Sequence, residues 1–183
     1  QLSASTGLAY KYTTDQLSTQ IKLTEQVGLQ AEDAAQINKF AIVNNKTSEE
    51  TYRSFVKGLT TARNQLKVGI NFKTALAEAA KVSGELAVNL GYNPETIAKA
   101  VVQMKALGTS LEQTKSQGDF LLNWETSIES ELKSELLIGQ QMNLERARAA
   151  ALTGDQITLA KELSNQGMTL QKFENLNVIA RRS

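Results

Sequence analysis

The chain has 183 residues, of which 41% are hydrophobic and 5% aromatic, and its 20 basic and 19 acidic side chains leave a net charge of +1. A charge this small gives no general electrostatic attraction to nucleic acid or to an anionic membrane. The absence of cysteine and histidine excludes disulfides, thiolate metal sites and imidazole as metal ligand or general base. We therefore expect no catalytic residue, cofactor, metal site, small-molecule substrate or specific nucleic-acid binding.

The composition favours helices over sheets. Alanine, leucine, glutamine, lysine, glutamate and threonine dominate, and such mostly unbranched side chains lose little freedom in a helix. The best apolar stretch, Ile97 to Leu107, is interrupted by polar residues and is much shorter than the ~20 residues that span a membrane. We predict an all-α protein without a membrane-spanning segment. Because the chain does not begin with Met, we expect it to be part of a longer protein.

The first half of the chain is predicted to hold four helices. Residues 1–13 are small and polar and are expected to form an arm or connector, and one helical region follows over 14–183. The expected helices cover 14–27 with Leu17, Ile21 and Thr24 on one face, 31–43, a third from Thr47, and 73–90 with Gly84 as its weak point.

The clearest of these helices begins at Thr47. Thr47 and Glu50 have the spacing of a capping box, and apolar residues then follow at steps of three and four, which is typical of one buried face. These residues are Tyr52, Phe55, Leu59, Ala62 and Leu66. The connector at 68–72 marks a sub-boundary of the helical region.

The second half begins with a strong helix start at Asn93-Pro94-Glu95, where Asn caps, Pro suits the first helical position and Glu complements the helix dipole. This helix is expected to break at Gly108, and the next to restart at Gly118-Asp119 and close at Gly139. The latter carries an apolar face of Leu121, Trp124, Ile128, Leu132 and Leu136. Three short helices are predicted over 144–152, 156–165 and 169–179.

A glycine-centred pattern occurs twice, as V-G-L-Q-A-E-D from Val27 and L-G-Y-N-P-E-T from Leu90. In both, glycine stops one helix and an acidic first turn starts the next, which predicts a repeated helix-turn-helix. Helix-ending glycines recur too often for the uninterrupted apolar face that a coiled coil needs. They also exclude one continuous helix, which would form a rod of roughly 270 Å. We predict an irregular antiparallel helical bundle or stacked helical hairpins.

Carboxylates cluster in the helix after Gly118, where Glu125 and Glu129 lie four residues apart, as do Glu131 and Glu135. Paired carboxylates can bind cations or cleave glycosides, so a hydrolase using Glu125 or Glu129 is one hypothesis. This spacing on one helix equally describes a solvated face, and we favour that interpretation. We expect the carboxylates of this face to form salt bridges with the basic helix that contains Arg53, Lys57 and Arg63.

Contacts with other proteins are the function that the residues favour. The alanine-rich faces around Ala147–Ala151 leave little apolar area per residue, so a neighbouring chain is expected to supply further burial. Tryptophan is enriched at interface hot spots, although the position of Trp124 in an apolar face also predicts the core. Basic residues of the last third lack the stacking aromatics of a nucleic-acid site. The interface candidates are Trp124, Tyr52, Phe55, Arg146 and Arg148.

Several of these stretches resemble bacteriophage tail tape measure proteins. The resemblance rests on the G-x-x-x-E patterns at Gly28 and Gly91, on the helix from Phe72 to Leu90, and on Leu144–Asp155 with Ala160–Leu163. The last two stretches are similar to an "A-R-x-x-A-L-x-G-D … A-x-E-L" phrase of that family. It implies a mostly helical virion protein, present in several copies in the tail tube, that sets tube length and leaves ahead of the genome.

The resemblance implies a structural role without catalysis, in the phage tail interior after assembly in the host cytoplasm. The implied partners are other copies of the chain and proteins of the tail tube or baseplate hub. Because glycine stops depart from a rod-like measuring segment, we expect a terminal or intervening globular region that lies in the tube lumen or at the tail tip. The alternative is a cellular helical adaptor or signalling scaffold that binds a protein partner through an exposed groove.

Overall fold

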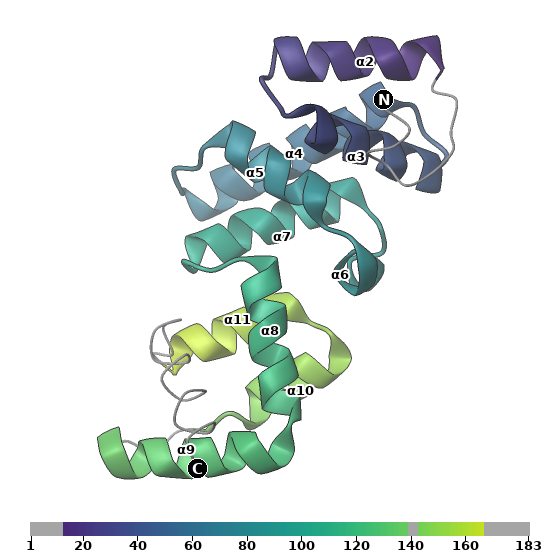
Figure 1. The fold of residues 1–183 in the computed structure, drawn as a ribbon. Coiled ribbons are helices and arrows are strands. Elements are labelled where there is room, and N and C mark those ends of the chain that lie inside the picture. Colours follow the sequence, from purple (N-terminus) through teal and green to yellow (C-terminus); the bar gives the residue numbers. More distant parts are fainter. Residues whose placement is uncertain (1–12, 139–142, 167–183) are drawn as a thin grey trace. The chain divides into compact units, whose positions relative to one another are not determined.

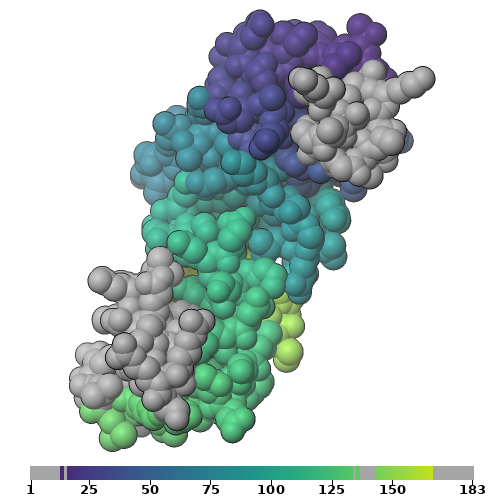
Figure 2. All heavy atoms as spheres, viewed as in Figure 1, coloured from purple at the N-terminus to yellow at the C-terminus, as the bar shows by residue number. Residues whose placement is uncertain are grey.

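The computed structural model describes residues 13–138 and 143–166, and Figure 2 draws residues of uncertain placement in grey. These described residues form ten helices and no strand, which confirms the all-α prediction (Figure 1). The longest described helix has 19 residues, so no continuous rod is present. In chain order they are α2 (Thr14–Glu25), α3 (Ala31–Val43), α4 (Ser48–Leu66), α5 (Phe72–Lys81), α6 (Gly84–Asn89), α7 (Pro94–Ala106), α8 (Leu111–Leu122), α9 (Trp124–Ile138), α10 (Glu145–Thr153) and α11 (Gln156–Asn165).

The chain divides into two compact units, residues 1–103 and residues 104–183. The connector at 68–72, where the sequence suggested a sub-boundary, lies inside the first unit. Within that unit α3 packs against α4 and α5, and α2 packs against α3 and α4. The predicted face of α4 is buried at its centre, in Phe55, Leu59 and Ala62, whereas Leu66 at its end is 40% exposed.

Both glycine patterns are helix stops, as predicted. Gly28 and Gly91 have φ of +74° and +64°, and the next helices begin three residues later at Ala31 and Pro94. Only glycine adopts this left-handed conformation without a steric cost, and it commonly ends a helix. The Asn93 side chain accepts hydrogen bonds from the backbone N–H of Glu95 and Thr96, at 3.0 and 3.1 Å. The predicted start of α7 is therefore confirmed.

Three predicted helix boundaries are wrong. The predicted helix over 73–90 is two helices, because the chain leaves helical geometry at Val82 and Ser83. Gly118 does not restart the chain but lies buried inside α8, whose start is a capping box at Ser110 and Gln113. Asn123 divides the next predicted helix into α8 and α9, and its side chain accepts hydrogen bonds from Thr126.

The predicted face of α2 is also wrong. Leu17 and Ile21 are 37% and 54% exposed, whereas Leu23 and the polar Gln20 are buried. Gln20 faces inward because its amide has partners there: it donates to the Ala31 carbonyl at 3.3 Å and accepts from Asn38 at 3.4 Å. Burial of a side-chain amide is tolerated when the amide is hydrogen-bonded. The two hydrogen bonds of Gln20 join α2 to α3.

The second unit is built around α8, α10 and α11, which pack against one another (Figure 1). Its core contains Leu121, Leu144, Ala147, Ala150, Leu159 and Leu163. The predicted hairpin of small residues is confirmed, since α10 ends at Gly154 and α11 begins after Asp155. Predictions for residues 1–12, Gly139 and the helix over 169–179 lie outside the described residues.

Asp155 caps α11 and should make the stability of the second unit depend on acid pH. Partial burial raises its pKa, but hydrogen bonds from the Thr158 backbone and hydroxyl outweigh that effect and hold the pKa below its ordinary 3.8. A carboxylate with a depressed folded-state pKa stabilises above its unfolded pKa and loses that contribution as pH falls through the folded value.

We expect Asp155→Asn to keep the cap but remove the charge. At pH 7 the variant should be less stable by under about 1 kcal/mol, and at a strongly acid pH, below the lowered folded-state pKa, the difference should vanish. Urea unfolding followed by Trp124 fluorescence at both pH values measures it. A difference that is the same at both pH values would contradict the assignment.

Candidate protein interface

Helix α9 buries two of its polar side chains and exposes its large apolar ones. Four large apolar residues spaced four apart are exposed: Trp124 (57%), Ile128 (41%), Leu132 (56%) and Leu136 (85%). We call this row the α9 ridge. On the inner face Ser127 and Ser130 are each 1% exposed. A surface helix ordinarily has the opposite arrangement. Because these four side chains are exposed, the prediction that they form a core face is wrong.

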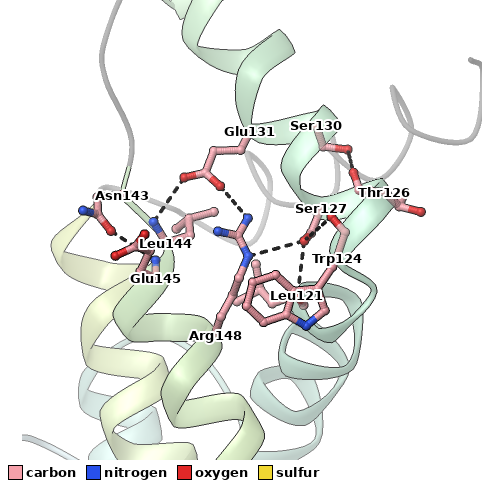
Figure 3. A network of polar contacts seen from close by, with 10 residues as sticks. All are labelled: Leu121, Trp124, Thr126, Ser127, Ser130, Glu131, Asn143, Leu144, Glu145 and Arg148. Carbon is pink, nitrogen blue, oxygen red and sulfur yellow. Dashed lines mark hydrogen bonds and ion pairs between the residues drawn. The ribbon is translucent and has the colours of Figure 1, made fainter.

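The inner face of α9 is held by Arg148, which α10 supplies (Figure 3). The Arg148 side chain is 5% exposed and forms an ion pair with Glu131, itself 12% exposed. Its Nε donates to the Ser127 hydroxyl at 3.4 Å, and the other Glu131 oxygen accepts from the Leu144 backbone N–H at 3.2 Å. A buried cation is tolerated when it is paired and hydrogen-bonded. The polar side of α9 faces inward, where Glu131 and Ser127 are the partners of Arg148.

Both buried serines of α9 have hydrogen-bond partners, and Ser127 belongs to the contact with Arg148. The Ser127 hydroxyl donates to the Leu121 carbonyl at 3.1 Å while it accepts from Arg148, and the Ser130 hydroxyl donates to the Thr126 carbonyl at 2.7 Å. Both hydroxyls are therefore satisfied without water. With its polar face engaged, α9 leaves its apolar row in solvent.

Trp124 connects the buried network to the ridge. The Arg148 guanidinium carbon lies 5.9 Å from the centre of the indole ring, which is within the range of a cation–π contact (Figure 3). The ring is held beside a fixed cation and remains 57% exposed. A large, positioned aromatic at the surface has the character of an interface anchor.

Acidic side chains border the ridge. Glu125 and Glu129 each follow a ridge residue in sequence and are exposed, and Glu129 pairs with Lys133 at 2.7 Å. The salt bridges predicted between these carboxylates and the basic helix of the first unit stay a prediction, and within that unit two of its cations have partners of their own. Arg53 pairs with Glu49 and Lys57 with Glu95, at 3.0 and 2.9 Å.

Of the five predicted interface residues, Trp124 and Arg148 contact each other. Phe55 is fully buried against Phe40, with ring centres 5.3 Å apart, so it offers no surface to a partner. Tyr52 is half-buried, and this burial raises the pKa of its hydroxyl. Arg146 is 81% exposed and pairs with Glu162 on α11 at 3.2 Å.

The sequence predicts that the ridge residues share one helix face, but it does not indicate whether that face points to the core or to solvent. Trp124, Ile128, Leu132 and Leu136 lie at helical spacing, which identifies a shared face and does not say whether that face meets the core or solvent. The missing information was the Arg148–Glu131 pair, which joins residues 17 positions apart.

A second apolar feature lies in the first unit. A groove of about 220 Å³ is lined by residues of α3 and of the segment from Val82 to Tyr92, among them Phe40, Val43 and Tyr92. Ligand pockets usually enclose about 300–1,000 Å³. This groove therefore has room for an apolar side chain of a partner rather than for a typical cofactor.

Among the described residues there is no group of three or more acidic residues placed to hold a metal ion, and no helix combines the length and apolarity needed to cross a membrane. No protein-family model, curated protein or solved structure matches the chain.

Proposed function

We propose that this chain is a structural segment of a phage tail tape measure protein, and that it acts by protein contact through the α9 ridge. The observation that carries the proposal is the continuous row of exposed apolar side chains from Trp124 to Leu136. An exposed apolar patch of a few hundred Å² is typical of an interaction site. Its anchor is a tryptophan fixed by a buried arginine, so little conformational entropy is lost when a partner covers it.

The residues that carry the family resemblance also build the support of the ridge. In the run from Leu144 to Asp155, Arg148 holds the inner face of α9, Gly154 ends α10 and Asp155 caps α11. In this proposal, the similar sequence pattern of tape measure proteins encodes a tight helical hairpin, and that hairpin positions a neighbouring helix. This agreement between motif and structural role supports the assignment without testing it.

The proposed partners are other copies of this chain and proteins of the tail tube or baseplate hub. The described helices are short and folded back, so the segment is assigned to a globular region rather than to the rod that measures the tube. In this role the chain performs no reaction. The alternative, a cellular adaptor, would use the same ridge on a different partner, and the location of the protein distinguishes the two.

Quantitative mass spectrometry of purified phage particles tests the assignment. We expect peptides of this chain in intact particles, in several copies per particle relative to tail tube protein, together with peptides from flanking sequence of the same polypeptide. Particles triggered to eject their genome should contain less of it, with tube protein as the unchanged control. Its absence from particles, and its recovery from uninfected cells, would overturn the phage assignment and favour the adaptor.

A further inference from the structure

The α9 ridge is the side of its helix that remains open to another molecule. The opposite side of α9 is engaged within the second unit, by the Leu121 carbonyl of α8 and by Arg148 of α10 (Figure 3). The ridge is about 18 Å long from Trp124 to Leu136, at 1.5 Å per residue. Its side chains are spaced four apart, and rows with this spacing interdigitate in the commonest packing of two helices. A helix that carries a similar row is therefore a fitting occupant.

A row of charged side chains runs beside the ridge. Glu125, Glu129 and Lys133 each follow a ridge residue and are spaced four apart, so they share one flank of the helix. Lys133 pairs with Glu129 at 2.7 Å. Glu125 is exposed and pairs with no cation among the described residues, and Lys133 lies eight residues away, about 12 Å along the helix. The flank is therefore acidic at its start and basic at its end, and the same flank running in the opposite direction complements it.

We propose that the α9 ridge pairs with the α9 ridge of a second copy of this chain, with the two helices antiparallel. A two-fold axis between the copies, perpendicular to the helices, places the same flank of each helix side by side in reversed order. Lys133 then lies between Glu129 of its own helix and Glu125 of the other copy. Trp124 of each copy packs near Leu136 of the other, so the apolar row is covered along its whole length.

A parallel pair of ridges lacks this charge complementarity. There the two-fold axis runs along the helices and sets the charged flank of one copy against the opposite flank of the other. The antiparallel arrangement instead forms the contact between Lys133 and Glu125 twice, once on each side of the axis. Complementary charges of this kind fix the orientation of a pair as well as the choice of partner.

This inference rests on the proposed function, because it takes the α9 ridge as a contact surface and names a second copy as what covers it. An exposed apolar patch of a few hundred Å² per copy is smaller than the ~800 Å² per partner of a stable protein interface. The pairing is therefore weak, with a Kd above about 1 µM, and it depends on concentration. Copies held close together in one assembly raise the effective concentration, so weak pairing is enough there.

Analytical ultracentrifugation of the full chain tests the pairing. Between about 5 µM and about 500 µM the average mass should rise from that of one chain toward that of two. Trp124 is the only tryptophan of the chain and stands at one end of the ridge. Its emission should shift to shorter wavelength over the same range, and its acrylamide quenching should fall about twofold, because the other copy covers the ring.

A substitution in the middle of the ridge tests whether the apolar row makes the contact. Leu132→Ser should weaken the pairing at least about tenfold, because each pair loses this side chain twice. Leu152→Ser is the matched control, since Leu152 lies on α10 of the same unit and is 72% exposed, against 56% for Leu132. The control should pair as the unmodified chain does. Far-UV circular dichroism verifies that each variant keeps its helices.

An exchange of charges tests the orientation. Glu125→Lys and Lys133→Glu each turn the proposed attraction into repulsion on both sides of the axis, so each alone should weaken the pairing about five- to tenfold. The double variant has opposite charges in exchanged positions and keeps the net charge of the chain. Its Kd should return to within about twofold of the unmodified value. Parallel helices give no such recovery, because these two residues do not meet.

A chain that stays a monomer over this range, with unchanged Trp124 emission, would overturn the proposal and assign the ridge to a different protein. Equal weakening by Leu132→Ser and Leu152→Ser would also contradict it, because the contact would then lie outside the ridge. If the double charge variant does not recover, the antiparallel orientation is wrong.

The measurement on phage particles is independent of these results. Pairing of a protein that is absent from particles would contradict only the phage assignment. Conversely, a protein that is present in particles and does not pair through α9 would contradict only this inference.

Discussion

Arg148→Met is expected to lower the free energy of unfolding of the second unit by about 3–5 kcal/mol, because it leaves the carboxylate of Glu131 buried without its cation. That carboxylate is 12% exposed and would retain only the Leu144 backbone N–H as a described partner. The Ser127 hydroxyl would lose a donor as well. Urea unfolding followed by Trp124 fluorescence measures the loss.

The chain offers a matched control two residues earlier on the same helix. Arg146 also forms an ion pair, with Glu162, but is 81% exposed, and Arg146→Met should cost less than about 1 kcal/mol. The double variant Arg148→Met with Glu131→Leu should recover much of the loss, since a buried pair replaced by apolar side chains leaves no unpaired charge. Equal losses for Arg148→Met and Arg146→Met would contradict the role of Arg148 in holding α9.

Gly58→Ala should destabilise the first unit by about 1–3 kcal/mol, the usual cost of forcing extra atoms into a packed contact. This glycine lies inside α4 where α7 passes close by. An added Cβ would lie 2.4 Å from the Glu95 carbonyl oxygen and 2.7 Å from the Ala98 Cβ, so the two helices would have to move apart. The change should also strain the ion pair between Lys57 and Glu95, which joins the same helices.

Helix propensity alone gives the opposite expectation, because alanine in a helix interior is favoured over glycine by about 1 kcal/mol. Gly118→Ala in α8 separates the two effects. Its Cβ would meet the end of the Leu159 side chain at 2.9 Å, and a side chain can shift where a backbone oxygen cannot. We expect a smaller loss there. Chemical unfolding followed by far-UV circular dichroism measures both variants, and a gain of stability in Gly58→Ala would show that the close approach is absent.

Helix starts with strong local signals could be predicted from the sequence. The capping box at Thr47 and Glu50 and the start at Asn93-Pro94-Glu95 are both present, because caps depend on residues within one turn of each other. The same signal was available for α8, where Ser110 and Gln113 form a capping box. That start was missed because Gly118 was interpreted as a break, whereas it provides close packing against α11.

The sequence by itself determined that this protein is helical and where most of its turns lie, since helices, caps and glycine stops are set by neighbouring residues. Only the tertiary structure decided which face of a helix is buried. In α2 a hydrogen-bonded Gln20 is buried in preference to Leu17, and in α9 the serines face inward while Trp124 stays in solvent. The physical reason in α9 is the buried charge of Arg148, which must be paired with Glu131 and Ser127. Periodicity identifies a face, and partners far away in the chain determine its direction.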